Sequence, residues 1–185
     1  MEKILNTEGK EFPYRIETQP FFYPVINYEY ACEIAQQWNI NNEISGFAGY
    51  ITVFEVDDEY IKQFTVHQVG SRTHVEYWIP SEELHNFNKN IIGTIRIKEA
   101  YFGNEFVGIP PLAVTGFREK NLFKQINNLS EILKYNNMDF SGTVFVEWKL
   151  MNLNYYYWMS NSTDYPDTLE RIKKALTINE KSFIV

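Results

Sequence analysis

The chain has 185 residues and a net charge of −7, and 17% of its residues are aromatic. That aromatic content argues against a disordered chain, and the acidic charge disfavours binding to the phosphate backbone of a nucleic acid. The single cysteine, Cys32, excludes a disulfide within this chain. No apolar stretch approaches the roughly 20 residues of a membrane span, so we expect a cytoplasmic protein with no nucleic-acid or membrane partner.

The sequence lacks the short motifs of several common enzyme classes. It contains no GxxxxGK[ST] loop, no GxGxxG, no HExxH, no acidic calcium loop and no GxSxG. His67 and His74 lie on consecutive predicted strands, but no Asp, Glu or Cys completes a ligand set at a familiar spacing. We therefore expect no metal site.

Hydrophobic periodicity predicts strands and short helices in the first half of the chain. In chain order they are a strand over 11–17, a helix over 28–38 capped by Asn27, a strand over 46–56, a short helix capped by Asp57, strands over 65–69 and 73–79, a helix starting at Ser81 and a strand over 91–101. The two strands on either side of Gly70 have the spacing of a hairpin.

Two consecutive prolines, Pro110 and Pro111, indicate a boundary near residue 108. We accordingly divide the chain into predicted domains 1–107 and 108–185. In the second part the patterns predict a helix over 120–135, strands over 141–150 and 155–159, a helix starting at Asp164 or Asp167 and an edge strand over 182–185. The expected fold class is α+β, with a small helix-strand-strand-helix module as its second part.

The most distinctive stretch runs from Thr65 to Ile95. It contains Gln-Val-Gly at 68–70, Glu-Tyr-Trp-Ile-Pro at 76–80, Glu-Glu-Leu at 82–84, Asn-Lys-Asn at 88–90 and Ile-Ile-Gly-Thr-Ile at 91–95. This series resembles the C-terminal part of a bacterial ADP-ribosyltransferase-like toxin domain. The resemblance extends more faintly over residues 11–100, about half of the chain.

The resemblance implies a split sheet with helices and the transfer of ADP-ribose from NAD to an acceptor. In such domains a glutamate supports the positive charge that develops on the ribose as nicotinamide leaves, and Glu76 matches it by position. An arginine on the opening strand contacts the phosphates of the cofactor, and Arg15 matches that position. Tyr23 or Tyr77 would then stack on the nicotinamide.

The sequence also departs from the pattern of that family. It has no Arg-Gly pair after the first strand and no Ser-Thr-Ser on the central strand, and the segment between Arg15 and the first helix is short for a cofactor-holding loop. Glu76 also fits the outward face of an alternating strand with His74 and Trp78, and Arg15 also fits an exposed surface position. The resemblance is therefore compatible with an active transferase or with a degenerate one.

A second function, from a different class, fits the same composition. A non-catalytic cytoplasmic interaction protein, such as a toxin-neutralising or regulatory module, would bind a protein partner through an acidic, aromatic surface. The acidic charge favours this function slightly because it attracts a basic partner at long range. The aromatic run over 155–158 either belongs to such a surface or is partly core, since alternate residues of a strand face opposite sides.

Overall fold

The structure is a computed structural model, and it describes residues 1–15, 18–112 and 114–185. Its strands are β1 (Phe21–Phe22), β2 (Ala48–Val56), β3 (Val66–Gln68), β4 (Val75–Tyr77), β5 (Ile79–Pro80) and β6 (Ile91–Phe102). Its α-helices are α1 (Glu2–Asn6), α2 (Tyr28–Glu33), α3 (Asp58–Ile61), α4 (Leu84–Lys89), α5 (Leu122–Tyr135), α6 (Asn137–Val146), α7 (Trp148–Asn161) and α8 (Pro166–Ile178). The expected α+β class is confirmed.

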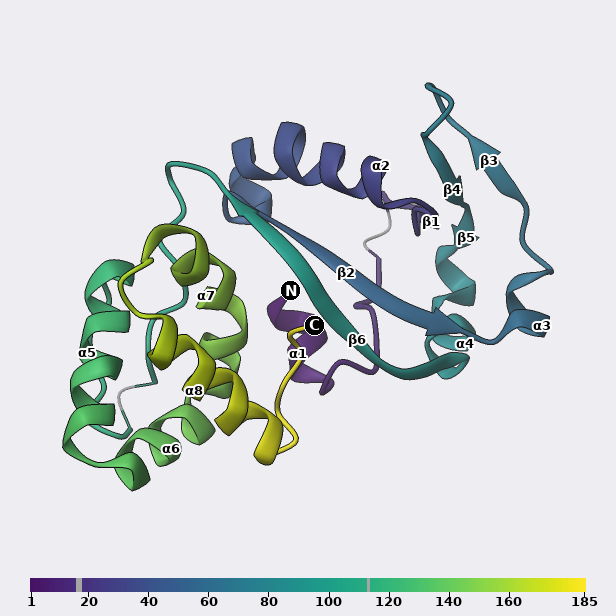
Figure 1. Cartoon of the computed structure of the whole chain (residues 1–185). Helices are drawn as coiled ribbons and strands as arrows, with labels where there is room; N and C mark the ends of the chain where they lie inside the picture. The colour runs from purple at the N-terminus through teal and green to yellow at the C-terminus, as the bar shows by residue number, and fades with distance from the viewer. Residues whose placement is uncertain (16–17, 113) are drawn as a thin grey trace.

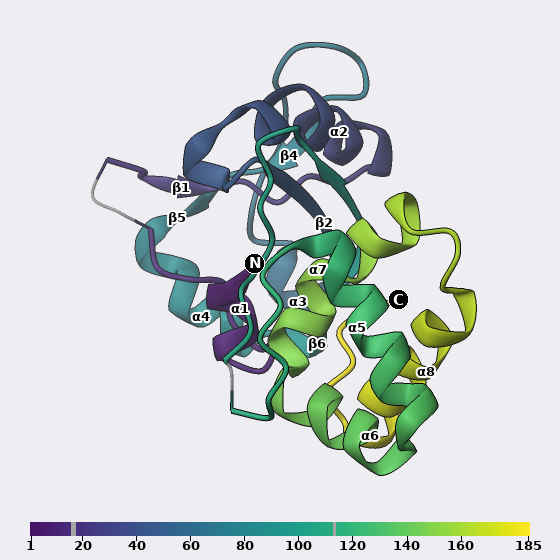
Figure 2. The same cartoon turned by 90° about the vertical axis from the view of Figure 1, so that its left-hand side faces the viewer.

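A long antiparallel ribbon of β2 and β6 runs through the molecule (Figure 1). Helices α5 to α8 gather on one side of it, and the hairpin of β3 and β4 lies near its opposite end (Figures 1 and 2). The short strands β1 and β5 also pair antiparallel. The predicted hairpin around Gly70 and the predicted strands over 46–56 and 91–101 are therefore confirmed.

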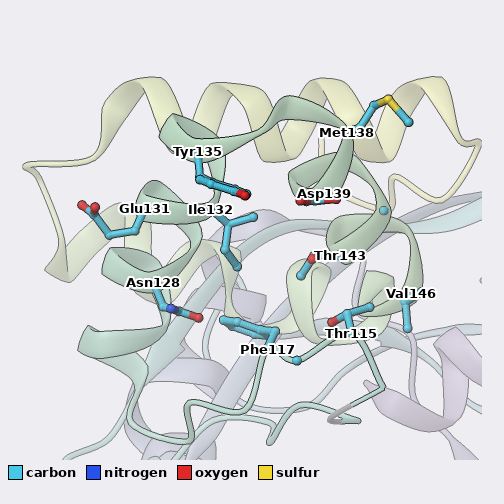
Figure 3. A pocket seen from close by; sticks show the side chains of 12 residues that line it. Thr115, Phe117, Asn128, Glu131, Ile132, Tyr135, Met138, Asp139, Thr143 and Val146 are labelled. Atoms are coloured by element: carbon cyan, nitrogen blue, oxygen red, sulfur yellow. The ribbon is translucent and has the colours of Figure 1, made fainter.

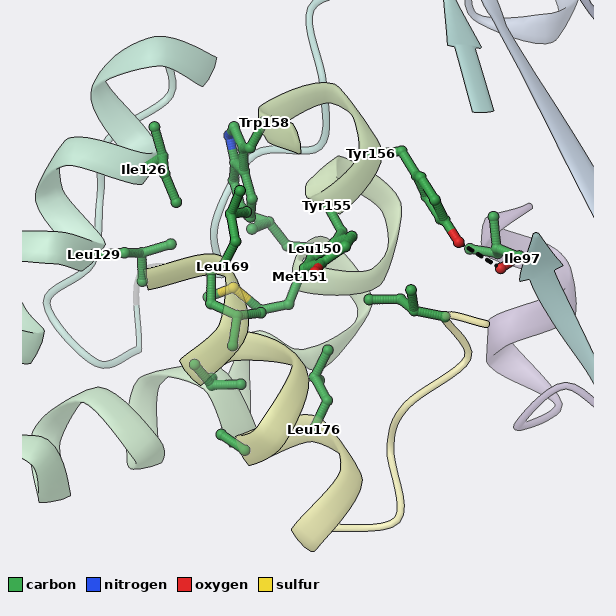
Figure 4. Packing of buried hydrophobic residues seen from close by; sticks show 14 of the residues in the cluster. Ile97, Ile126, Leu129, Leu150, Met151, Tyr155, Tyr156, Trp158, Leu169 and Leu176 are labelled. Atoms are coloured by element: carbon green, nitrogen blue, oxygen red, sulfur yellow. Dashed lines mark hydrogen bonds between the residues drawn. The ribbon is translucent and has the colours of Figure 1, made fainter. Parts of the chain in front are cut away.

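The largest hydrophobic core lies where the helices meet the ribbon (Figure 4). Trp158 of α7 is fully buried there, and its Nε1 donates a hydrogen bond to the Leu122 carbonyl at 2.9 Å. The Tyr156 hydroxyl donates to the Ile97 carbonyl of β6, also at 2.9 Å. Replacing a buried aromatic side chain of this kind by alanine typically costs about 3–5 kcal/mol, so α7 is the central element of this core.

The same core contains residues from both sides of the predicted boundary at residue 108. Ile97 and Ala100 of β6 belong to it together with residues of α5 to α8. The end of the chain returns to the ribbon as well, because Ile184 forms a parallel bridge with Ile97. The division into 1–107 and 108–185 thus stays a prediction about folding units, and the two parts share one packed interior.

The expected helix-strand-strand-helix module is wrong, because the segments predicted as strands over 141–150 and 155–159 are helical. Residues on nearly every side of α7 are buried, including Leu150, Met151 and Tyr155. A helix buried all round shows no 3.6-residue period, and a short apolar run cannot then be distinguished from a buried strand. The buried amides of Asn152 and Asn154, residue types typical of a turn, bond to neighbouring backbone instead.

The predicted strand over 11–17 is also not found in residues 11–15, and residues 16 and 17 lie outside the described part of the chain. The Asn88 side chain takes the place of a neighbouring strand. Its Oδ1 accepts from the Phe12 amide at 2.9 Å and its Nδ2 donates to the Phe12 carbonyl at 3.0 Å. One buried side chain therefore satisfies the backbone groups that a strand would have paired.

Candidate functional site

Glu76 lies in the middle of β4, between β3 and the extended segment before α2. His67 is its partner in β3, and Val25 forms a bridge with it on the other side. The Glu76 side chain is only 8% exposed, and its Oε1 accepts a hydrogen bond from Trp78 Nε1 at 2.9 Å. Glu76 and Trp78 share one face, as strand alternation predicts, but the expected outward position of Glu76 is wrong because its side chain is buried.

Tyr30 of α2 lies next to the same carboxylate, and His74, which directly precedes β4, packs on Tyr30. Their rings stack at a centroid separation of 4.3 Å, and His74 Nε2 lies 2.8 Å from an oxygen of Glu33. Burial raises the pKa of the Tyr30 phenol, and the neighbouring charges of Glu76 and Glu33 raise it further. Tyr30 therefore stays protonated as a donor, and the cluster ties α2 to the hairpin.

The other predicted site residues are only partly gathered around Glu76. The Tyr23 ring lies 6.0 Å from the Trp78 ring, which places it beside the Glu76 face. Tyr77 follows Glu76 in the strand and packs against the core on the opposite face. Tyr23 thus lies beside Trp78, the residue that bonds to Glu76, whereas Tyr77 faces the opposite side of the strand.

Arg15 packs its guanidinium over the Phe22 ring, 4.8 Å from the ring centroid. Its Nε is buried and has no hydrogen-bond partner in the described part of the chain. Burial lowers the pKa of Arg15, and the nearby Tyr23 phenol opposes that shift. Phe22 points into the core with Ile79, so Arg15 contacts the side of the sheet opposite to Glu76.

A pocket of about 650 Å³ lies elsewhere, between α5, α6 and the connection that precedes α5 (Figure 3). That connection, residues 108–117 with residue 113 outside the described part, is here called the strap. The residues lining the pocket are Thr115, Gly116, Phe117, Asn128, Glu131, Ile132, Tyr135, Met138, Asp139, Gly142, Thr143 and Val146. Its size is within the range of pockets that hold ligands or peptide side chains.

Buried polar side chains fix the strap against the helices. The Leu112 amide donates to both carboxylate oxygens of Glu147, at 2.9 and 3.0 Å. Asn154 Oδ1 accepts from the Ile109 amide at 3.2 Å, and Gln125 Nε2 donates to the Glu119 carbonyl at 3.0 Å. Since Glu147, Asn154 and Gln125 are buried, the wall formed by the strap is held from the protein interior.

The rim of the pocket exposes apolar side chains to solvent. Tyr135 is 85% exposed and Met138 is 80% exposed, although both line the pocket. Phe117 is buried at its base, beneath Ile132 (Figure 3). Gly142 also lines the pocket and is exposed, and an added Cβ atom there would meet no heavy atom within 4 Å.

The hydrophobic pattern does not indicate this pocket, because it predicts a strand over 141–150 where the pocket is lined by a helix. The start of that helix can be recognised from local residues instead. Asn136 caps α6, accepting from the Met138 amide at 2.8 Å, and Asp139 follows in the first helical turn. An Asn cap followed by an acidic residue is typical of a helix start.

No family model matches this chain. Comparisons with protein-family models, with curated proteins and with solved structures all found no match. Among the described residues, none of the helices combines the length and the apolar character needed to cross a membrane. Within residues 1–15, 18–112 and 114–185, no group of three or more His, Cys, Asp or Glu side chains is placed to hold a metal ion.

Proposed function

We propose that this chain is a non-catalytic protein-binding module whose recognition site is the pocket between α5, α6 and the strap. The observation that carries the proposal is the exposure of Tyr135 and Met138 above an open, apolar-based pocket. Large exposed apolar side chains around a concavity are typical of interaction sites. The buried bonds to the strap support it, because a wall fixed before binding lowers the entropy cost of association.

Gly142 offers a way to block the pocket without disturbing the core. A side chain at this position enters open space, and nearly every residue is a better helix former than glycine. Gly142→Gln fills the pocket with a long, neutral side chain, and Gly142→Ala is the matched control that leaves it open. Both variants should fold at least as stably as the wild type.

The test is quantitative affinity capture from an extract of the producing cells, with the three proteins immobilised in parallel. We expect a set of proteins that the wild type and Gly142→Ala retain and that Gly142→Gln loses. Cross-linking from a photoreactive residue at position 135 should then join the retained protein to the pocket rim. Identical sets of captured proteins on all three would contradict the proposal.

The second candidate is an NAD-dependent ADP-ribosyltransferase, active or degenerate, with the fold that the sequence resemblance implies. One observation favours it: Glu76 is a buried carboxylate beside Tyr23 and Trp78. The position of Arg15 does not favour it, because Arg15 contacts the opposite side of the sheet through Phe22. In this proposal Glu76 would stabilise the developing ribose cation, and Arg15 would contact the cofactor phosphates. NAD is the implied cofactor, with a protein as acceptor.

Calorimetry with NAD tests this candidate. Wild type should bind NAD and release nicotinamide, and Glu76→Gln should bind but release it at least about a hundredfold more slowly. Glutamine keeps an oxygen that can accept from Trp78 Nε1, so the variant should remain folded. Absence of heat on titration with millimolar NAD would eliminate the transferase and leave the binding module.

A further inference from the structure

We infer that the pocket between α5, α6 and the strap accepts a peptide segment in which a large apolar residue is flanked on both sides by lysine or arginine. The inference rests on the proposed function and specifies the chemistry of the partner. It follows from where the charged side chains of the pocket lie relative to its apolar base.

The charged side chains that line the pocket, Glu131 and Asp139, are both acidic. Glu131 is ion-paired with Lys134 at 2.8 Å, but both of these side chains are largely exposed. An exposed pair of this kind is worth at most about 1 kcal/mol, so a competing cation from a partner can replace Lys134. Asp139 forms no ion pair within the described residues.

The two carboxylates lie on opposite sides of the apolar part of the pocket. Figure 3 shows Glu131 to one side of Tyr135 and Ile132, and Asp139 to the other. A segment that inserts an apolar side chain towards Phe117 would therefore pass a carboxylate on each side of its anchor. The net charge of −7 attracts such a basic segment further and accelerates its association.

The polar groups of the pocket suit the backbone of such a segment. Asn128 and Thr143 line the pocket together with Thr115 of the strap, and amides and hydroxyls can donate to or accept from a peptide backbone. An acidic segment would bring negative charges close to both carboxylates, and a purely apolar segment would offer them no opposite charge. The acidic flanks thus select against these alternatives as well as attracting a cation.

Selection from a random peptide library displayed on phage, with the wild-type protein as bait at low ionic strength, tests the inference. We expect the enriched peptides to carry an apolar residue between Lys or Arg residues. Binding of a synthetic copy should weaken about tenfold or more in the double variant Glu131→Gln, Asp139→Asn. High ionic strength should have a similar effect, because salt screens exposed charges.

The matched control is Asp167→Asn, Glu170→Gln on α8, which removes the same charge from exposed positions outside the pocket. This control should bind the peptide like the wild type. Two results would overturn the inference and leave the proposed function standing. The peptides that Gly142→Gln no longer binds would lack basic residues, or they would bind the double variant as tightly as the wild type. Failure to select any peptide whose binding Gly142→Gln abolishes would count against both.

A second copy of the chain is the other occupant to examine. Sedimentation of the wild type and of Gly142→Gln distinguishes the two cases. A monomer in both proteins is the expected result. Self-association that Gly142→Gln abolishes would assign the pocket to another copy of this chain and overturn the inference.

Discussion

Glu147 shows how much of the pocket depends on a single side chain. It is 2% exposed, and both of its carboxylate oxygens accept from the Leu112 amide. A buried polar group left without its hydrogen-bond partner costs about 1–3 kcal/mol. The position of the strap is therefore set from behind the pocket, by a residue that does not line it.

We expect Glu147→Gln to lower the free energy of unfolding by about 1–3 kcal/mol, because the amide replaces one of the two acceptor oxygens by a donor. Urea unfolding measures the loss, and hydrogen exchange should show faster exchange of the Leu112 amide. Glu131→Gln, at an exposed position, should change stability by less than about 0.5 kcal/mol. Equal Leu112 exchange in wild type and Glu147→Gln would show that this bond does not hold the strap.

At the Glu76 site, the sequence predicts some of the contacts but not all of them. Strand alternation places Glu76 and Trp78 on one face, and the structure joins them by a hydrogen bond. The contribution of Tyr30 is not foreseeable, because it comes from a helix more than forty positions earlier in the chain. The roles of Glu76, Arg15, Tyr23 and Tyr77 in NAD chemistry stay predictions.

Among the elements, α6 carries a glycine inside a helix without a packing reason for it. A Cβ at Gly142 would meet nothing within 4 Å, and Gly142 lines the pocket. Gly116 in the strap also meets nothing, but its φ of +86° is a conformation that other residues rarely adopt. Replacing each glycine by alanine should therefore change the free energy of unfolding in opposite directions.

We expect Gly142→Ala to raise the free energy of unfolding by about 0.5–1 kcal/mol, because alanine is the better helix former. Gly116→Ala should lower it by about 1 kcal/mol or more, since the new Cβ is strained at positive φ. Chemical denaturation of the two variants beside the wild type is sufficient to compare them. A destabilised Gly142→Ala would show that the space around Gly142 is closed in solution.

Most elements of the first half, with the exception of the predicted strand over 11–17, are predicted well because their signals are local. Asn27 caps α2 by accepting from the Tyr30 amide, and Asp57 caps α3 by accepting from the Tyr60 amide. The strand predictions over α6 and α7 are wrong because the β-branched and aromatic residues of these helices favour strands and are buried on many sides. Tertiary burial overrides the local preference there.

The molecule as a whole contains many tyrosines in its packed regions. Burial is the main cause that raises the pKa of Tyr50, Tyr155 and Tyr156, and it contributes most to a pKa of about 12 for Tyr101. The unfolded chain releases these protons near pH 10, before the folded protein does. The contribution of the buried tyrosines to the free energy of unfolding is therefore fully present below about pH 10. It is lost as the pH rises through the pKa values of these tyrosines in the folded protein.

We expect the free energy of unfolding to fall steeply above about pH 10. Denaturant titrations at successive pH values measure this fall. Tyr50→Phe provides the internal comparison. At neutral pH it should be less stable by about 1 kcal/mol, since it loses the hydrogen bond to the Leu153 carbonyl. That deficit should shrink at alkaline pH; a constant deficit would show that Tyr50 does not contribute to the alkaline loss.

The sequence by itself determined the α+β class, the hairpin, the capped helices and the acidic character, because each depends on near neighbours or on composition. Only the tertiary structure decided that residues 137–146 and 148–161 are helical, that Asn88 replaces a strand at Phe12, and that Glu147 holds the strap. These features depend on contacts between residues far apart in the chain, such as the 76 positions between Phe12 and Asn88. Burial of side chains on all faces, which no local pattern records, made the difference.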